Sequence, residues 1–89
     1  MQIVCTTLFE QQLKALLETM AQQDFQATKS FKIYLDTIIL NMPTKAKKYK
    51  KSLYFDDEDI RDIDHQGFLI PFFIDKENDT YLLLGIVEK

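Results

Sequence analysis

Apolar residues in the first half of the chain recur at the spacing of α-helices. The first stripe consists of Phe9, Leu13, Leu16, Leu17 and Met20. It predicts an amphipathic helix that ends near residue 22 or 23. A second stripe predicts another helix and consists of Phe31, Tyr34, Leu35, Ile38, Ile39 and Met42. Asp24 is expected to cap this helix and Pro43 to terminate it, so residues 8–42 should form an antiparallel helical hairpin.

The hairpin is preceded by a short strand. Residues 1–7 are β-branched and alternate in hydrophobicity, which predicts an extended conformation. Threonine is a favoured helix cap, so Thr6 or Thr7 is expected to begin the first helix. Glu10 is placed to complete a capping box on Thr7.

Three more strands are predicted in the second half of the chain, at residues 60–65, 68–75 and 80–87. Pro71 has no N–H to donate, so its strand is expected to be bulged there or to lie at an edge. The expected fold is α+β: one strand, an antiparallel helical hairpin and a three-stranded antiparallel meander, together forming one sheet.

The last two predicted strands are apolar on both faces, which indicates that both faces are covered. The helical hairpin can cover only one of them. We therefore expect the other face to bind a protein partner or a second copy of the chain.

A segment without periodicity joins the hairpin to these strands. Residues 43–52 are expected to be a lysine-rich connection, residues 53–55 a brief extended piece, and residues 56–59 a solvated acidic turn. Charge changes sign here, because residues 1–54 carry eight lysines against four acidic residues, and the rest carry three basic residues against ten acidic ones. The molecule should therefore be an electrical dipole despite its net charge of only −3.

The length and composition predict one domain over residues 1–89, located in the cytoplasm. No apolar stretch approaches the length of a membrane span, and the single cysteine, Cys5, is expected to be a small core residue. The acidic run lacks the ligand spacing of a calcium loop, so no metal is expected, and no cofactor motif is present.

Residues 49–62 read Tyr-Lys-Lys-Ser-Leu-Tyr-Phe-Asp-Asp-Glu-Asp-Ile-Arg-Asp. This resembles the Tyr-Arg-x-Ser-x-Tyr-Phe-Asp-Asp-x-x-Ile-Arg-Asp signature of one branch of the RelE/ParE superfamily, the toxins of bacterial type II toxin–antitoxin systems. The order of predicted elements, Gly67-Phe68 and the turn at residues 78–80 also match that pattern. The resemblance covers nearly the whole chain.

The resemblance implies a growth-inhibiting toxin, of the kind also associated with plasmid stabilisation, that a cognate antitoxin neutralises. The antitoxin would insert a helix or strand against the toxin's uncovered apolar sheet face. The residues expected to bind it are Leu69, Phe73, Leu82, Leu84 and Ile86.

The resemblance leaves the cellular target open. Ribosome-dependent members cleave messenger RNA with basic and aromatic residues, whereas gyrase-directed members act by binding. Here Leu69 and Gly85 stand where the nucleases usually carry basic residues, which argues against ribonuclease activity. A gyrase inhibitor and an inactive relative are the alternatives.

Three residues remain weak catalytic candidates: Lys48, Arg61 and His65. Arg61 is more simply expected to pair with Asp56, Asp57 or a carboxylate on a neighbouring strand, and His65 to be a surface or turn residue. The lysine cluster could contact ribosomal RNA, DNA near gyrase or an acidic antitoxin tail, or could be a solvated linker; it consists of Lys45, Lys47, Lys48, Lys50 and Lys51.

Overall fold

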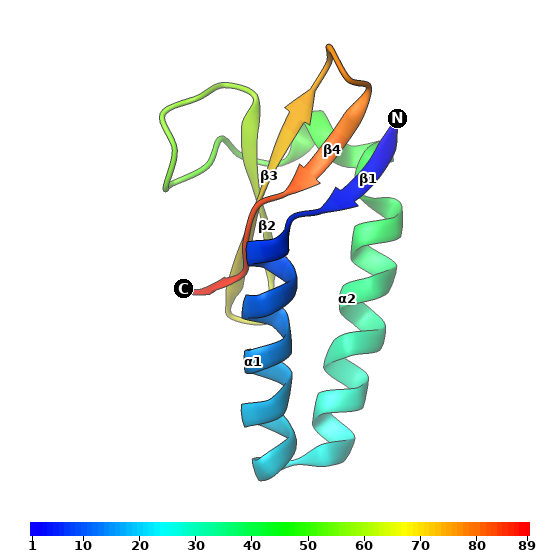
Figure 1. Ribbon diagram of the computed structural model, residues 1–89, viewed down its shortest axis with the longest axis vertical. Helices are drawn as coiled ribbons and strands as arrows, with labels where there is room; N and C mark the ends of the chain where they lie inside the picture. The colour runs from blue at the N-terminus through cyan, green and yellow to red at the C-terminus, as the bar shows by residue number, and fades with distance from the viewer.

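A computed structural model describes residues 1–89 and shows two long helices extending from one side of a twisted sheet (Figure 1). The elements in chain order are β1 (Gln2–Cys5), α1 (Thr7–Gln23), α2 (Phe25–Lys45), the short 3₁₀ helix η1 (Ala46–Lys48), β2 (Ile60–His65), β3 (Phe68–Asp75), β4 (Thr80–Leu83) and β5 (Val87–Glu88). The α+β class, the helical hairpin and the antiparallel β2–β3–β4 meander are as predicted.

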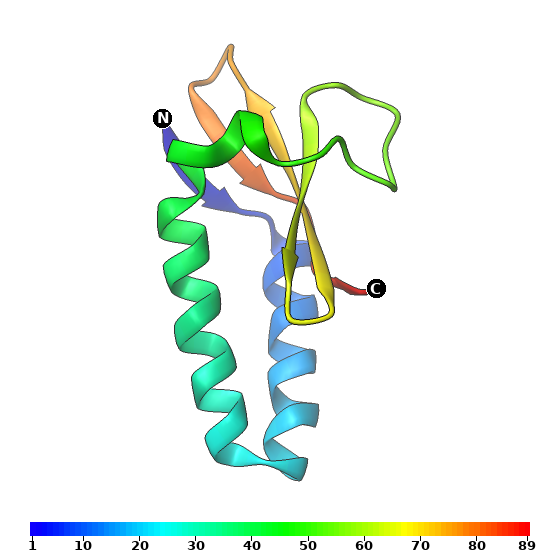
Figure 2. The same cartoon turned by 180° about the vertical axis from the view of Figure 1, so that it is seen from behind.

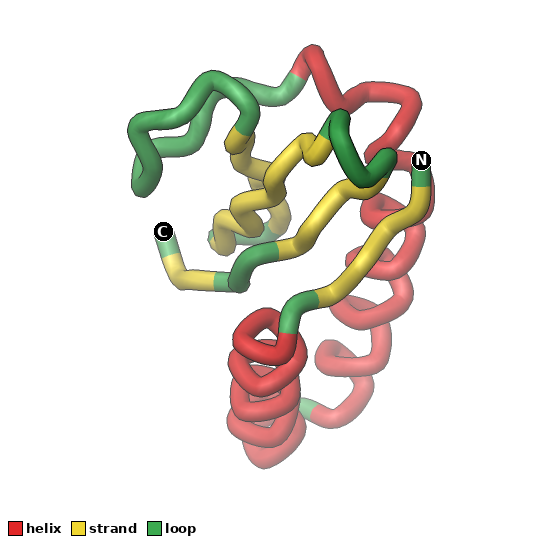
Figure 3. Tube along the Cα trace, turned by 45° about the horizontal axis from the view of Figure 1, so that its top comes forward, coloured by secondary structure: helices red, strands yellow, loops and turns green.

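The strands follow the order β1-β4-β3-β2 across the sheet. β1 pairs in parallel with β4, so the first and last parts of the chain lie side by side (Figure 3). The turn between β2 and β3 is formed by Gln66 and Gly67, both with positive φ, as a tight hairpin requires.

The strand predicted at residues 80–87 is interrupted after Leu83. Pro71 of β3 accounts for the position of this interruption. Pro71 lies inside β3, between β2 and β4, with continuous pairing to β2, so neither the edge position nor the bulge in its own strand is correct. Its carbonyl accepts from the N–H of Leu84 at 2.8 Å, but it has no N–H to return to Leu84. The neighbouring strand leaves β3 there and pairs with it again as β5, opposite Phe68 and Leu69.

The first helix begins one residue earlier than the predicted capping box requires. Thr6 is the cap, and its Oγ1 accepts from the N–H of Phe9 at 3.2 Å. The capping box between Thr7 and Glu10 is therefore wrong, and the N–H of Glu10 instead donates to the carbonyl of Thr6 at 3.1 Å.

The second helix begins as predicted but continues through Pro43. Asp24 caps it through Oδ1, which accepts from the N–H of Ala27 at 3.0 Å. The helix then runs to Lys45 and tightens into η1, which crosses the end of the sheet (Figure 2). Packing keeps Met42, the residue before the proline, helical, because its side chain is fully buried. Proline in the last turn removes only one helical hydrogen bond.

The core lies between the hairpin and one face of the sheet. Its fully buried side chains come from both layers. The helices contribute Leu35 and Met42 of α2, and the sheet contributes Ile63 of β2, Ile70 and Phe72 of β3, and Leu83 of β4. The predicted α1 stripe packs here, but Tyr34 of the predicted α2 stripe does not. Tyr34 is 58% exposed, because its position on the helix lies beyond the margin of the buried stripe.

Candidate functional site

The face of the sheet opposite the helices carries an apolar patch. Side chains alternate along a strand, so Phe73 and Leu82, which are paired across β3 and β4, point away from the core that contains Phe72 and Leu83. Val4 lies beside Leu82 on β1, and Leu84 follows the end of β4. These four residues, which are all partly exposed, are here called the open patch.

Two other residues of the predicted antitoxin surface are buried. Ile86 is a correction: it is 5% exposed and belongs to the core cluster. Strand alternation would place it beside Leu84, but the chain has left the strand ladder there, and the N–H of Ile86 donates to Oε1 of Gln12 in α1 at 2.9 Å. Leu69 is also buried, but its side chain points to the same face of the sheet as that of Phe73, because the two residues are four positions apart in β3.

Gly85 permits this contact with α1. A Cβ atom on Gly85 would lie 2.7 Å from Oε1 of Gln12, well inside van der Waals distance. The position at which the nucleases of the superfamily are expected to carry a basic residue is thus buried against a helix.

A pocket of about 450 Å³ lies beside the outer edge of β2. Leu69 lines it together with charged residues from the lysine-rich segment, β2 and the last position of the chain: Lys48, Lys50, Lys51, Asp62, Asp64 and Lys89. Asp62 pairs with Pro71 and Asp64 with Leu69, so the pocket is on the sheet face that carries Phe73. We call this the β2 pocket.

Asp62 is the most buried charged residue of the β2 pocket, with 7% of its surface exposed. Its Oδ2 accepts from the N–H of Leu53 at 2.9 Å, whereas its Oδ1 is buried without any hydrogen-bond partner. An unpaired buried acceptor is costly in the absence of a ligand or a water. Nothing in the sequence pattern distinguished Asp62 from the other acidic residues around it.

Two of the pocket's four lysines are already paired. Lys89 contacts Asp64 at 2.6 Å, and Lys51 contacts Asp56 at 2.8 Å. The hydrogen bond between Lys51 and Asp56 raises the pKa of the lysine and lowers the pKa of the carboxyl group. Lys48 and Lys50 are exposed and make no ion pair, so two positive charges remain available beside Asp62.

The lysine cluster is divided by the structure. All five of its lysines are exposed, but Lys45 and Lys47 do not line the β2 pocket, whereas Lys48, Lys50 and Lys51 do. The connection is also more regular than predicted, since its end pairs with the outer edge of β2 through a bridge between Lys51 and Arg61. The N–H of Asp62 donates to the carbonyl of Lys50 at 3.0 Å, and the N–H of Ser52 donates to that of Ile60 at 2.8 Å.

The three catalytic candidates are not brought together. Arg61 and His65 alternate with Asp62 and Asp64 along β2 and therefore lie on the helix side, away from Lys48 in the pocket. His65 is 4% exposed and packs on the ring of Phe31 with centroids 5.1 Å apart, so the expected surface histidine is a core residue.

Arg61 binds main-chain carbonyls and not carboxylates. Its Nη1 donates to the carbonyl of Tyr49 at 2.7 Å and to that of Lys47 at 3.5 Å. The predicted pairing with Asp56, Asp57 or a strand carboxylate is wrong, because the alternation turns the guanidinium toward the chain that leaves η1.

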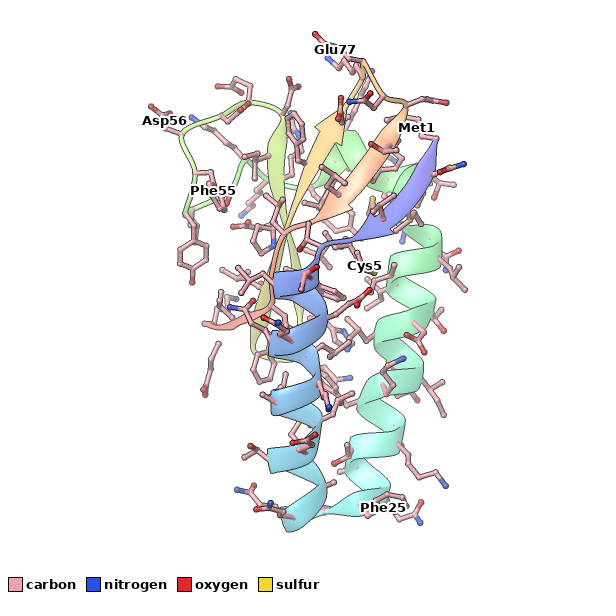
Figure 4. The ribbon with its side chains drawn as sticks, viewed as in Figure 1. Met1, Cys5, Phe25, Phe55, Asp56 and Glu77 are labelled. Atoms are coloured by element: carbon pink, nitrogen blue, oxygen red, sulfur yellow. The ribbon has the colours of Figure 1, made fainter.

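The loop before the acidic turn projects three apolar side chains into solvent. Leu53, Tyr54 and Phe55 are exposed, Leu53 by 80%, and Phe55 and Asp56 lie at the outer end of the loop (Figure 4). Hydrogen bonds fix the base of this loop: Leu53 N–H to Asp62, and Tyr54 N–H to Oγ of Ser52 at 3.1 Å. The sequence signal was three apolar residues in a row outside any periodic stripe.

Cys5 is exposed at the end of β1 and is not the core residue that was expected (Figure 4). Partial burial and the nearby carboxylates of Glu10 and Asp36 raise the pKa of its thiol, whereas Lys32 opposes them. A raised pKa disfavours the thiolate, which is the reactive form of cysteine.

Neither helix combines the length and the hydrophobicity needed to cross a membrane. Comparison with protein families gives one result: the family described as ParE toxin of type II toxin-antitoxin system, parDE, matches residues 3–88. No curated protein matches the chain.

Proposed function

Because the chain belongs to the ParE toxin family, and is thus the toxin component of a type II toxin–antitoxin system, we propose that its antitoxin neutralises it by covering the open patch. The observation that carries this proposal is the position of Phe73 and Leu82 on the sheet face that the helical hairpin leaves uncovered. Apolar side chains gathered on one face favour a protein partner, which removes them from water on binding.

The partner would be a short apolar or amphipathic segment. Such a segment can lie along β3 and bury the exposed parts of Phe73 and Leu82. We leave Ile86 out of this proposed surface because it packs in the core, and we retain Leu69 as part of the adjoining β2 pocket.

Co-expression with the product of the small reading frame beside the gene tests this proposal. Leu82→Lys should weaken the complex by at least about tenfold, because a charge would be buried without a partner. Leu40→Lys is the matched control, since Leu40 is 74% exposed on α2 and its change adds the same charge. Equal affinities of the two variants, both folded by circular dichroism, would overturn the proposal, as would failure of the unaltered toxin to bind.

We further propose that this toxin inhibits growth by binding its target and not by cleaving RNA. RNA cleavage needs a base for the 2′-hydroxyl and cations for the developing phosphorane charge. Leu69 and Gly85 occupy the expected basic positions, Gly85 is packed against Gln12, and the side chains of Arg61 and His65 are engaged on the helix side of β2. DNA gyrase is the candidate target for this mode of action, because the gyrase-directed members of the superfamily act by binding.

Inducible expression without the antitoxin distinguishes these modes of action. Growth arrest with DNA damage and intact messenger RNA is the expected result. Primer extension that reveals new messenger-RNA ends would overturn the binding mode. Harmless expression of soluble, folded protein would instead identify an inactive member of the family and overturn growth inhibition itself.

A further inference from the structure

We propose that the β2 pocket binds an acidic segment of the antitoxin, whose carboxylate pairs with Lys48 and Lys50. This inference rests on the proposed function, since it assigns a second contact to the same partner. It concerns different residues from those of the open patch.

The β2 pocket and the open patch lie along the same strand. Leu69, Pro71 and Phe73 alternate on the same face of β3, and Leu69 lines the pocket. The four-residue step from Phe73 to Leu69 spans about 13 Å of strand. An extended antitoxin segment of similar length that lies on Phe73 can therefore place its next residues in the pocket.

Asp62 does not itself offer the ligand a hydrogen bond. Its Oδ2 accepts from the N–H of Leu53, and its Oδ1 is enclosed by the protein, out of reach of a ligand in the pocket.

The charges around Asp62 select an anionic ligand. Lys51 and Lys89 are engaged with Asp56 and Asp64, which leaves Lys48 and Lys50 without an ion pair. These two positive charges exceed the single negative charge of Asp62, so the pocket favours an anionic group. An aspartate or glutamate of the antitoxin can pair with both lysines.

The lysine-rich segment is fixed in place before a ligand binds. Arg61 holds the carbonyls of Lys47 and Tyr49, and the carbonyl of Lys50 accepts from the N–H of Asp62. The main chain that carries Lys48 and Lys50 is therefore already ordered, and binding has only to immobilise their side chains.

The test uses two double variants of the full chain that remove the same charge. Lys48→Gln/Lys50→Gln takes away the unpaired lysines of the pocket, and Lys45→Gln/Lys47→Gln takes away two lysines of the same segment outside it. Affinity for the purified cognate antitoxin is measured by isothermal titration calorimetry at low and at physiological ionic strength. We expect the pocket variant to bind at least about tenfold more weakly and the control to bind within about threefold of the unaltered toxin.

A second series of variants tests the ligand side. Replacing antitoxin aspartates and glutamates one at a time by their amides should identify one whose loss is silent in the Lys48→Gln/Lys50→Gln background.

The outcomes separate this inference from the proposed function. If Leu82→Lys disrupts the complex but the two lysine double variants bind equally well, antitoxin binding stands and the pocket assignment is overturned. The assignment is likewise overturned if the pocket variant loses affinity only for single-stranded RNA. Failure of the unaltered toxin to bind the antitoxin overturns both.

Discussion

Nη1 of Arg61 donates a hydrogen bond to the main-chain carbonyl of Tyr49 over 2.7 Å. The two residues belong to different parts of the fold, since Arg61 is in β2 and Tyr49 follows η1. This bond, with the bridge between Lys51 and Arg61, attaches the lysine-rich segment to the sheet. Arg61 therefore contributes to the β2 pocket by fixing the position of the main chain around Lys48.

Arg61→Ala should lower the free energy of unfolding by about 2 kcal/mol, the usual range for losing hydrogen bonds from a charged donor. Arg61→Lys should lose nearly as much, because an ammonium group lacks the fixed fork of the guanidinium. Urea denaturation followed by circular dichroism measures both. An unchanged unfolding midpoint for Arg61→Ala would contradict the positioning role.

Gly85→Ala should destabilise the protein by about 1 kcal/mol through the loss of one hydrogen bond. The new methyl group would displace the carboxamide of Gln12, which accepts from the N–H of Ile86. The same substitution should cost less in a Gln12→Ala background, where that acceptor is already missing. A double-mutant cycle in urea measures the coupling, and strict additivity would show that the contact is not the cause.

His65→Leu should leave both stability and growth inhibition close to those of the unaltered toxin. The substitution loses the ring contact with Phe31 but removes the buried Nε2, which has no hydrogen-bond partner. These effects oppose each other and are each about 1 kcal/mol. Growth curves and thermal unfolding provide the measurements; a folded variant that had lost its toxicity would return His65 to the catalytic candidates.

Asp75 should make the protein's stability depend on pH in acid. The side-chain amide of Asn78 donates to its Oδ2 at 2.8 Å and the N–H of Asn78 to its Oδ1 at 3.1 Å, which lowers the pKa of Asp75 below 3.8. A lowered pKa in the folded state gives stability that is present above the ordinary pKa and is lost as the pH falls through the lowered value.

Asp75→Asn should therefore flatten the decline of stability between about pH 5 and about pH 2. Glu77→Gln is the control, since it removes an exposed carboxylate from the same turn. Urea midpoints measured across this range provide the comparison. Parallel pH profiles for the two variants would show that the hydrogen bonds from Asn78 contribute nothing.

Periodicity was sufficient to predict the helices, the strands and the fold class, because each depends on which residues face the core. It failed where the deciding partner is remote in sequence. Pro71 was recognised as unable to donate, yet the irregularity appears in the neighbouring strand, because Leu84 is the residue facing the missing N–H. Pro43 was predicted to end α2, but the burial of Met42 keeps the chain helical past the proline, to Lys45.

The site was predicted in part for the same reason. The open patch follows from strand alternation, which is a local property, and Phe73 and Leu82 were found that way. The special position of Asp62 depends on Leu53, whose N–H takes one carboxylate oxygen and leaves the other unpartnered. Several neighbouring acids share its composition and charge, so only the folded chain distinguishes it.

The parallel pairing of β1 with β4 has a consequence for biosynthesis. Thr6 and Leu83 are 77 positions apart, yet Oγ1 of Thr6 donates to the carbonyl of Leu83 at 2.7 Å. A nascent chain can form its helical hairpin from local contacts, but β1 has no partner strand until β4 has emerged from the ribosome. The sheet that carries the open patch is thus completed only after β4 has emerged, and the growing toxin offers its antitoxin no finished surface before then.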